Sequence, residues 1–419
     1  MTYDAAIIGA GIVGAACADA LTEAGASVIV IEPNIVGGGA TAAGMGHIAV
    51  MDDSEAQFAL TNFSRQLWLN LVPRMPPAVE FEQRGALWVA ADEEELAAVR
   101  TKLSFYAHRG VRAQMLNETE LREAEPNLRH GLAGGLLVPG DAVIYAPCAA
   151  AWLLERAVRH GAKLQRGIEV DQLRKDCVVL AGGLLVPGDA VIYAPCAAAW
   201  LLERAVRRGA KLQRGIEVDQ LRKDSVVLAG GPVVSAKAII CAAGADALRW
   251  FPRLDIKPRK GHLAITGRYP GFVNHQLIEL GYLKSAHDST ADSVAFNVQP
   301  RATGQILVGS SRQFGGDNGS IDPHMLRNMM ARAVAYMPAL AGLQVIRTWT
   351  GFRAATSDSL PIIGLHEGLH GDNVYLATGH EGLGITTSLG TAHLITAAVL
   401  GLQPAIDPAP YLPGRGHRH

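Results

Sequence analysis

The sequence predicts an α/β fold, because each end of the chain carries an apolar strand that runs into a glycine-rich turn and a helix. Near the N-terminus, residues 4–8 are typical of a short buried strand, and the turn Gly9-Ala10-Gly11-Ile12-Val13-Gly14 follows directly. Residues 15–24 have helical character, and a second apolar strand at 27–31 ends at Glu32. Strand, glycines, helix, strand and terminal acid in this order indicate a dinucleotide-binding unit. Glu32 is then expected to accept the ribose hydroxyls of an adenosine.

The glycines of this first turn have separate expected roles. Gly9 permits the tight turn, Gly11 lets the backbone approach a pyrophosphate, and Gly14 lets the helix pack closely on the strand. The start of the helix, around Ile12 and Val13, offers free N–H groups and a partial positive charge to the phosphates.

A loop of small residues, GGGATAAGMGH, follows at 37–47. Such a loop lets a second backbone segment press against a cofactor. An NAD enzyme has no obvious need for it, whereas a flavin whose pyrophosphate is clamped from both sides does. We therefore expect contacts with FAD at Thr41, Ala42, Met45 and Gly46.

The second strand, turn and helix lie near the C-terminus. Residues 349–364 read WTGFRAATSDSLPIIG, a strand follows at 374–378, and GHEGLGIT opens another helix. The N-terminus of this helix is expected to stabilise negative charge on a reduced flavin ring, which raises its tendency to accept hydride. The residues expected there are Gly382, Leu383, Gly384, Ile385 and Thr386.

Composition narrows the class of protein. The 419 residues suffice for two domains or for one large α/β domain with a cap, and 49% of them are hydrophobic. The formal net charge of -1 argues against nucleic acid as a partner and favours a small molecule. The five cysteines form no CxxC motif, and the histidines show no metal-ligand spacing, so we expect a cytoplasmic protein without disulfides or a bound metal. The apolar run at 383–402 is expected to be a core helix rather than a membrane span.

These linked motifs resemble the D-amino-acid oxidase superfamily of FAD-dependent amine oxidoreductases, in the branch with glycine oxidase and sarcosine oxidase. The resemblance implies a Rossmann-type FAD-binding domain with an inserted mixed-sheet α+β substrate domain. It places 1–80, 141–250 and 345–419 in the first domain and 81–140 and 251–344 in the second. The strand at 236–241 and the Ala243 and Gly244 that follow resemble the family segment that passes the adenosine.

Further strings are similar to the bacterial D-hydroxyproline dehydrogenases, among them AGMGHIAVMDDSEAQFALTNFSRQLW, ADSVAFNVQPR and GHEGLGITTS. The implied reaction moves a hydride from the Cα of an amino acid to flavin N5 and gives an imine, with 4-hydroxy-D-proline as the expected substrate. A glycine, sarcosine or D-amino-acid oxidase is the alternative, and a flavoprotein that serves only as an assembly subunit is a second. The electron acceptor stays open between oxygen, a quinone and an electron-transfer protein, and a homo-oligomer is possible.

The resemblance also implies which side chains meet the substrate. Arg353 matches the arginine of a W-x-G-x-R motif, and its planar guanidinium can bind both oxygens of a carboxylate. His47, on the loop that should reach the flavin ring, and Tyr282 and Arg312, in substrate-domain motifs, are the other catalytic candidates. Residues 350–354 include no cysteine where relatives with covalent flavin have one, so FAD is expected to be held without a covalent bond.

One segment occurs twice. Residues 133–180 recur at 181–228 and differ only at His160/Arg208 and Cys177/Ser225, which indicates a tandem duplication within an existing fold. Only one copy can occupy the helix and the adenine-side strand that the fold requires, and the displaced helix must pack elsewhere. The second copy runs directly into the following strand, so we expect Val218 rather than Val170 at the adenine, with no preference between the two helices.

Overall fold

The first of two large sheets carries the dinucleotide motif. In the computed structural model, the described residues are 2–166, 173–174, 177–178, 218–222, 225–228, 233–281, 292–314, 318–367 and 373–415. The sheet has the strand order β11-β12-β13-β1-β2-β8, with β20 beside β13 and β19 beside β20. Its strands are β1 (Thr2–Ile8), β2 (Val28–Glu32), β8 (Lys163–Arg166), β11 (Val218–Arg222), β12 (Ser225–Leu228), β13 (Val233–Cys241), β19 (Ile362–Leu365) and β20 (Val374–Thr378).

The centre of this sheet is parallel and buried on both faces. β20, β13, β1, β2 and β8 pair with one another in this order, and all four of these pairings are parallel. Ala5 and Ile7 enter one hydrophobic core and Ala6 and Ile8 the other. Burial on both faces explains why β1 is a continuous apolar run rather than an alternating one.

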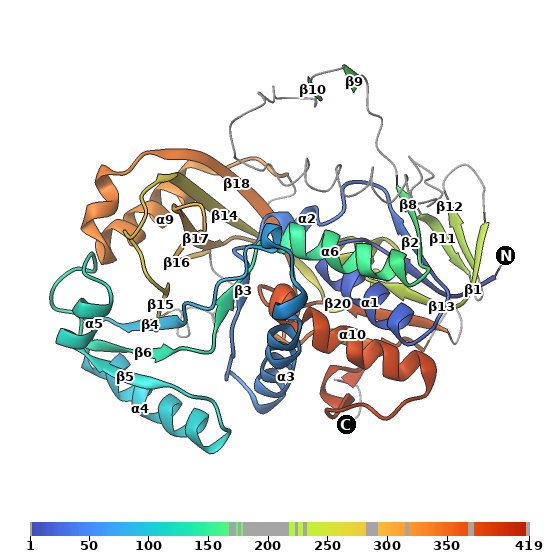
Figure 1. Ribbon diagram of the computed structural model, residues 1–419, viewed down its shortest axis with the longest axis horizontal. Coiled ribbons are helices and arrows are strands. Elements are labelled where there is room, and N and C mark those ends of the chain that lie inside the picture. The colour runs from blue at the N-terminus through green and yellow to red at the C-terminus, as the bar shows by residue number, and fades with distance from the viewer. Residues whose placement is uncertain are drawn as a thin grey trace.

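Helices cover this sheet and join the two ends of the chain. α1 (Ile12–Glu23) packs against both α6 (Ala146–Arg159) and α10 (Gly384–Leu400), and α10 also contacts α3 (Glu55–Leu71) (Figure 1). None of the helices in the described part of the chain is long and apolar enough to cross a membrane.

The second sheet has the order β18-β14-β17-β16-β15-β4-β6-β5, and among its described strands only the β15–β4 pairing is parallel. Helix α9 (Pro323–Tyr336) covers one face, with Met329 and Ala333 in a core shared with Phe296 and Val298. The strands are β4 (Ala86–Ala90), β5 (Gln114–Asn117), β6 (Gly134–Val138), β14 (Lys257–Arg268), β15 (Gln276–Glu279), β16 (Ser293–Pro300), β17 (Gln305–Arg312) and β18 (Val345–Ala355).

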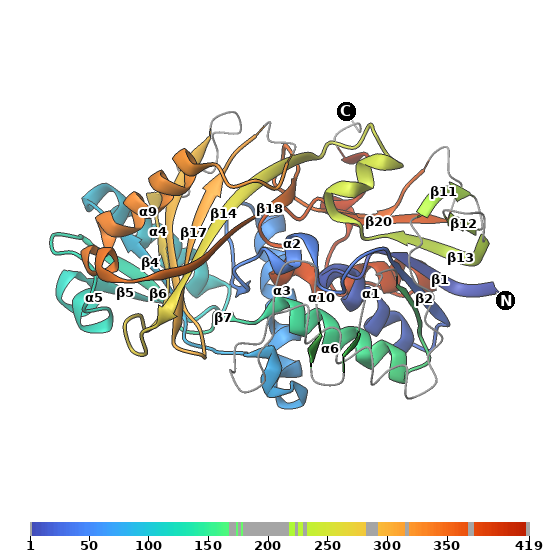
Figure 2. The ribbon, with the colours of Figure 1, turned by 90° about the horizontal axis from the view of Figure 1, so that it is seen from above.

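The two sheets form lobes that lie side by side, with β14 and β18 reaching from the second toward the first (Figures 1 and 2). The described residues also include the smaller elements α2 (Gly39–Ala42), α4 (Glu93–His108), α5 (Glu118–Ala124) and the strand pairs β3 (His47–Ile48) with β7 (Ala142–Val143) and β9 (Leu173–Arg174) with β10 (Cys177–Val178).

One boundary differs from the division expected from the sequence. That division assigned residues 345–419 to the first domain, but β18 pairs with β14 from Val345 to Ala355, in the second sheet. Strand β18 is therefore part of the second sheet, and the chain returns to the first lobe only after Ala355.

Both repeat copies contribute to the first lobe. The first copy supplies α6 and β8, and Arg156 of α6 donates from Nε to both carboxylate oxygens of Asp19 in α1 at 2.8 Å. The second copy supplies β11 and β12. Val218 begins β11, but its side chain and all of Val170 lie outside the described residues. The expected adenine contact of Val218 remains a prediction.

Candidate functional site

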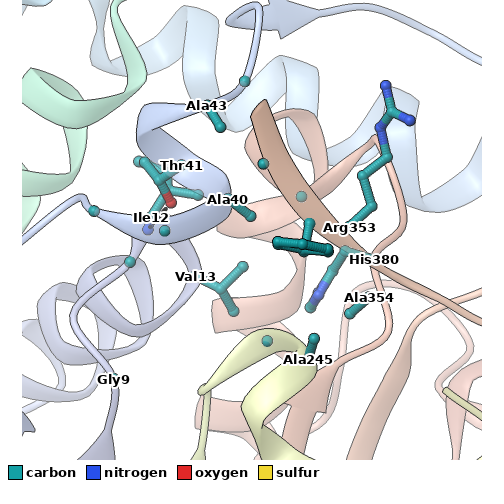
Figure 3. Close-up of a pocket in the computed structure, with 18 of the residues that line it drawn as sticks. Gly9, Ile12, Val13, Ala40, Thr41, Ala43, Ala245, Arg353, Ala354 and His380 are labelled. Atoms are coloured by element: carbon teal, nitrogen blue, oxygen red, sulfur yellow. Dashed lines mark hydrogen bonds between the residues drawn. The ribbon is translucent and has the colours of Figure 1, made fainter. Parts of the chain in front are cut away.

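A cavity lies at the carboxyl ends of β1, β2, β13 and β20, where the two lobes meet (Figure 3). The crevice at this edge of an open parallel sheet is the usual ligand position in α/β proteins. Of the residues predicted from the sequence, these line it: Gly9, Gly11, Ile12, Val13, Glu32, Thr41, Met45, Gly46, His47, Ala243, Gly244, Arg353, Gly382, Gly384 and Ile385.

The first turn has the close backbone approaches that the glycines were expected to allow. Gly9 has φ +100°, and a Cβ there would lie 2.7 Å from the carbonyl oxygen of Ala242. A Cβ on Gly14 would lie 2.0 Å from the carbonyl oxygen of Gly9. Only glycine fits either position, and the result is a helix that starts directly beneath the cavity.

The start of α1 faces the small-residue loop. The N–H of Ile12 donates a 3.0 Å hydrogen bond to Oγ1 of Thr41 in α2. This places a hydroxyl and the positive end of a helix on one wall of the cavity, which is the environment that a pyrophosphate prefers.

Glu32 is held with its carboxylate at the end of β2. One oxygen accepts from the N–H of Ala10 at 2.8 Å and the other from the N–H of Asn34 at 2.7 Å. A carboxylate accepts hydrogen bonds and donates none, which is the chemistry that ribose hydroxyls require of a partner. Together with the glycine turn, this side chain fits the adenosine diphosphate half of a dinucleotide.

The C-terminal segments close the other side. α10 begins at Gly384 without a side-chain cap, so its first N–H groups are available to a ligand. Gly382, Gly384 and Ile385 line the cavity, whereas Leu383 packs beneath it against a hydrophobic cluster. Thr386 is buried and bonds to the backbone of β3, so its role is to hold the cavity wall.

Arg353 projects from β18 into the same cavity (Figure 3). Its side chain lies over Gly261, and its Nη1 donates to the carbonyl oxygen of Ser311 at 2.9 Å. A Cβ on Gly261 would lie 3.0 Å from Nη2, so the absence of a side chain on β14 makes room for the guanidinium.

Two more arginines and a glutamate surround this guanidinium. Arg259 donates to Glu381 at 3.1 Å, with both side chains nearly buried. Burial alone would raise the pKa of Glu381, but the positive charges of Arg353, Arg312 and Arg259 hold it below its ordinary value. Arg312, predicted from the sequence, is itself buried at the end of β17. Tyr282, also predicted, lies outside the described residues.

His47 is held by two amide side chains. Its Nδ1 lies 2.5 Å from Oε1 of Gln276, and Nδ2 of Asn297 lies 3.2 Å from its Nε2. Burial lowers the pKa of His47, which favours the neutral imidazole.

Asn297 and Gln276 were not among the residues predicted from the sequence. Asn297 stands in the string FNVQP, where the polar Asn297 and Gln299 alternate with the apolar Phe296 and Val298. That alternation was a readable signal that one face of the strand meets something polar. Glu381 stands in the string GHEGLGIT, but its ion pair with Arg259 joins residues 122 positions apart, so the local sequence does not indicate it.

Fold and cavity together define a dinucleotide-binding protein, and sequence comparison specifies the family. The profile of the FAD dependent oxidoreductases, or DAO family, matches residues 4–181 and 175–398, so the chain belongs to this family. Its cofactor is FAD, and the predicted fold class and membership of the D-amino-acid oxidase superfamily are confirmed.

The relatives differ in how much of the chain they match. Glycine oxidase of Geobacillus kaustophilus is 25% identical over 421 residues, which cover 98% of this chain and 96% of that protein. A D-amino acid dehydrogenase of Chromohalobacter salexigens is 52% identical over 60 residues, 14% of each chain. The crystal structure of L-proline dehydrogenase from P. horikoshii has a TM-score of 0.78 at 20% identity, over 100% of this chain and 98% of that one.

Proposed function

We propose that the protein is an FAD-dependent amino-acid dehydrogenase or oxidase whose substrate is 4-hydroxy-D-proline. The observation that carries the proposal is the position of Arg353, a half-buried guanidinium in the cavity that also contains the dinucleotide cradle. When bound without a covalent link, FAD supplies the acceptor for the hydride that leaves the substrate Cα.

Arg353 is proposed to bind the substrate carboxylate. Its bond to the Ser311 carbonyl fixes the plane of the guanidinium, and a guanidinium can donate to both oxygens of a carboxylate at once. Two-point binding fixes the orientation of the substrate, which is how the Cα–H bond is aimed at the hydride acceptor.

The charges near Arg353 favour the reactive form of the amine. Arg353, Arg312 and Arg259 all place positive charge near Glu381, beside the position proposed for the substrate. Nearby positive charge lowers the pKa of a bound ammonium group. The amine is thereby kept neutral, with the electron pair that an imine requires.

Anaerobic reduction of the purified flavoprotein tests the proposal. We expect 4-hydroxy-D-proline to bleach the flavin absorbance faster than D-proline, sarcosine or glycine at equal concentration. Full reduction by dithionite with no response to any amino acid would contradict the assignment and favour a non-catalytic assembly subunit. Oxygen uptake after air is readmitted then separates an oxidase from a dehydrogenase that uses a quinone or a protein acceptor.

A second candidate, oxidation of glycine or sarcosine, is favoured by the glycine oxidase relative that is similar over nearly the whole chain. The same panel distinguishes the two candidates, since faster reduction by glycine or sarcosine than by either proline would select it.

A further inference from the structure

Three amide side chains stand on the face of the second sheet that turns toward the cavity. Gln276 lies on β15, and Asn297 and Gln299 lie two positions apart on β16. The residues between them, Phe296 and Val298, point to the opposite face and pack in the core beneath α9. Of these three amides, Asn297 lines the cavity, where Leu263 and Met45 are also part of the wall.

His47 fixes the orientation of two of these amides. As placed, Asn297 Nδ2 donates to Nε2 of the imidazole, so Nε2 carries no proton. The proton of the neutral imidazole is then on Nδ1 and is donated to Oε1 of Gln276 at 2.5 Å. Because Nδ2 of Asn297 donates to His47, Oδ1 of the same amide points away from the imidazole.

That oxygen is an open acceptor. Asn297 is 8% exposed, and its Oδ1 is buried and accepts no hydrogen bond from the described residues. Asn297 also lines the cavity. An unpaired buried acceptor costs free energy, which a bound donor would recover.

Asn297 and the carbonyl to which Arg353 donates lie on the neighbouring strands β16 and β17. The guanidinium reaches the carbonyl of Ser311 on β17, two residues from Gly309, the partner of Asn297 across the sheet. One strand spacing and two residues along a strand put the backbone of Asn297 about 8 Å from that of Ser311. A substrate whose carboxylate binds Arg353 can therefore present a substituent on its far side to Asn297.

We propose that Asn297, oriented by His47, accepts a hydrogen bond from the ring hydroxyl of the substrate and so selects 4-hydroxy-D-proline over D-proline. This inference deepens the proposed function and rests on it. Asn297 acts on substrate choice, while His47 is a positioning residue that holds its amide.

Replacement of Asn297 by leucine, close in size but without the amide, tests the inference. We expect N297L to lower kcat/KM for 4-hydroxy-D-proline about 10-fold relative to D-proline, with D-proline itself little changed. N297D keeps an acceptor and should retain the preference, although its absolute rate falls. If N297L does not retain FAD, N297A carries the same test without added volume.

A matched control is N127L, because Asn127 donates to the Phe272 carbonyl in the same lobe and does not line the cavity. It should leave the ratio of the two substrates unchanged. Equal losses for both substrates in N297L would overturn the inference, since a role in binding the amine or in stability alone acts on both. A wild-type flavin reduced by neither proline would overturn the proposed function itself, before any variant is made.

Discussion

The hydroxyl of Thr386 donates a 2.9 Å hydrogen bond to the backbone carbonyl of His47, a residue 339 positions away in the chain. The same hydroxyl accepts from the N–H of Ala49 at 3.3 Å. Thr386 is in the first turn of α10, and His47 ends the small-residue loop, so one side chain joins two walls of the FAD cavity.

Replacement of Thr386 by valine should lower the free energy of unfolding by about 1–3 kcal/mol, because the His47 carbonyl and the Ala49 N–H lose their partner. Thr396→Val is the matched control in the same helix, since the buried Thr396 hydroxyl has no hydrogen-bond partner among the described residues. It should be neutral or stabilising. Urea unfolding of both FAD-loaded variants measures the two free energies of unfolding. Equal decreases in the two variants would contradict the proposed role of the Thr386 hydrogen bonds.

Gly9→Ala should abolish stable binding of FAD. The new Cβ would lie 2.7 Å from the Ala242 carbonyl, so β13 would have to move away from the turn. Gly25→Ala is the control, because Gly25 has φ +90° but a Cβ there meets nothing within 4 Å. It should cost about 1–2 kcal/mol of backbone strain and keep the flavin. The ratio of flavin to protein absorbance after gel filtration measures the difference, and a fully loaded Gly9 variant would refute the proposed cradle.

Arg353→Lys should lower kcat/KM for the amino-acid substrate about 10- to 100-fold, because lysine keeps the charge but cannot bind a carboxylate at two points. Arg347→Lys makes the same exchange at an exposed position of the same strand and should have little effect. Rapid-mixing measurements of flavin reduction separate weaker binding from a slower hydride step. Similar rates for the two variants would remove Arg353 from the substrate site.

Glu381→Gln should tighten the binding of a simple carboxylate such as acetate several-fold, since Arg353, Arg312 and Arg259 would lose the negative charge among them. It should also lower the free energy of unfolding by about 3 kcal/mol, because the nearly buried Arg259 is left unpaired. Asp4→Asn, which breaks the exposed pair with Lys237, should cost at most about 1 kcal/mol. Flavin difference spectra give the affinity, and weaker acetate binding in the Glu381 variant would contradict the charge balance described above.

His380 should contribute to acid sensitivity. Burial lowers the pKa of His380 from 6.5 to about 4, so the folded protein holds this side chain neutral where the unfolded chain would protonate it. Its contribution to stability is complete above about pH 6.5 and is lost as the pH falls toward 4. Across that window, His380→Gln should reduce the slope of unfolding free energy against pH by up to about 1.4 kcal/mol per unit. An unchanged slope in urea titrations at several pH values would show that His380 is not the responsible group.

The sequence by itself determined the parts of the site that depend on local sterics. Gly9, Gly11, Gly14 and Glu32 follow one another within one strand, turn, helix and strand, so their order alone indicated the dinucleotide and their separate roles. The loop at 37–47 likewise distinguished FAD from NAD through the size of its residues.

The tertiary structure decided the side-chain contacts that depend on how the strands pair. The bonds of His47 to Gln276 and Asn297 join residues 229 and 250 positions apart and exist only because β15 and β16 pair in one register. Pairing with β14 put β18 in the second sheet, and tertiary packing placed α6 of the first repeat copy beside α1, where the sequence alone gave no preference between the two copies. A one-residue change of register turns every side chain of a strand to the other face, so such contacts are set by the assembled sheet and not by the residues that flank them.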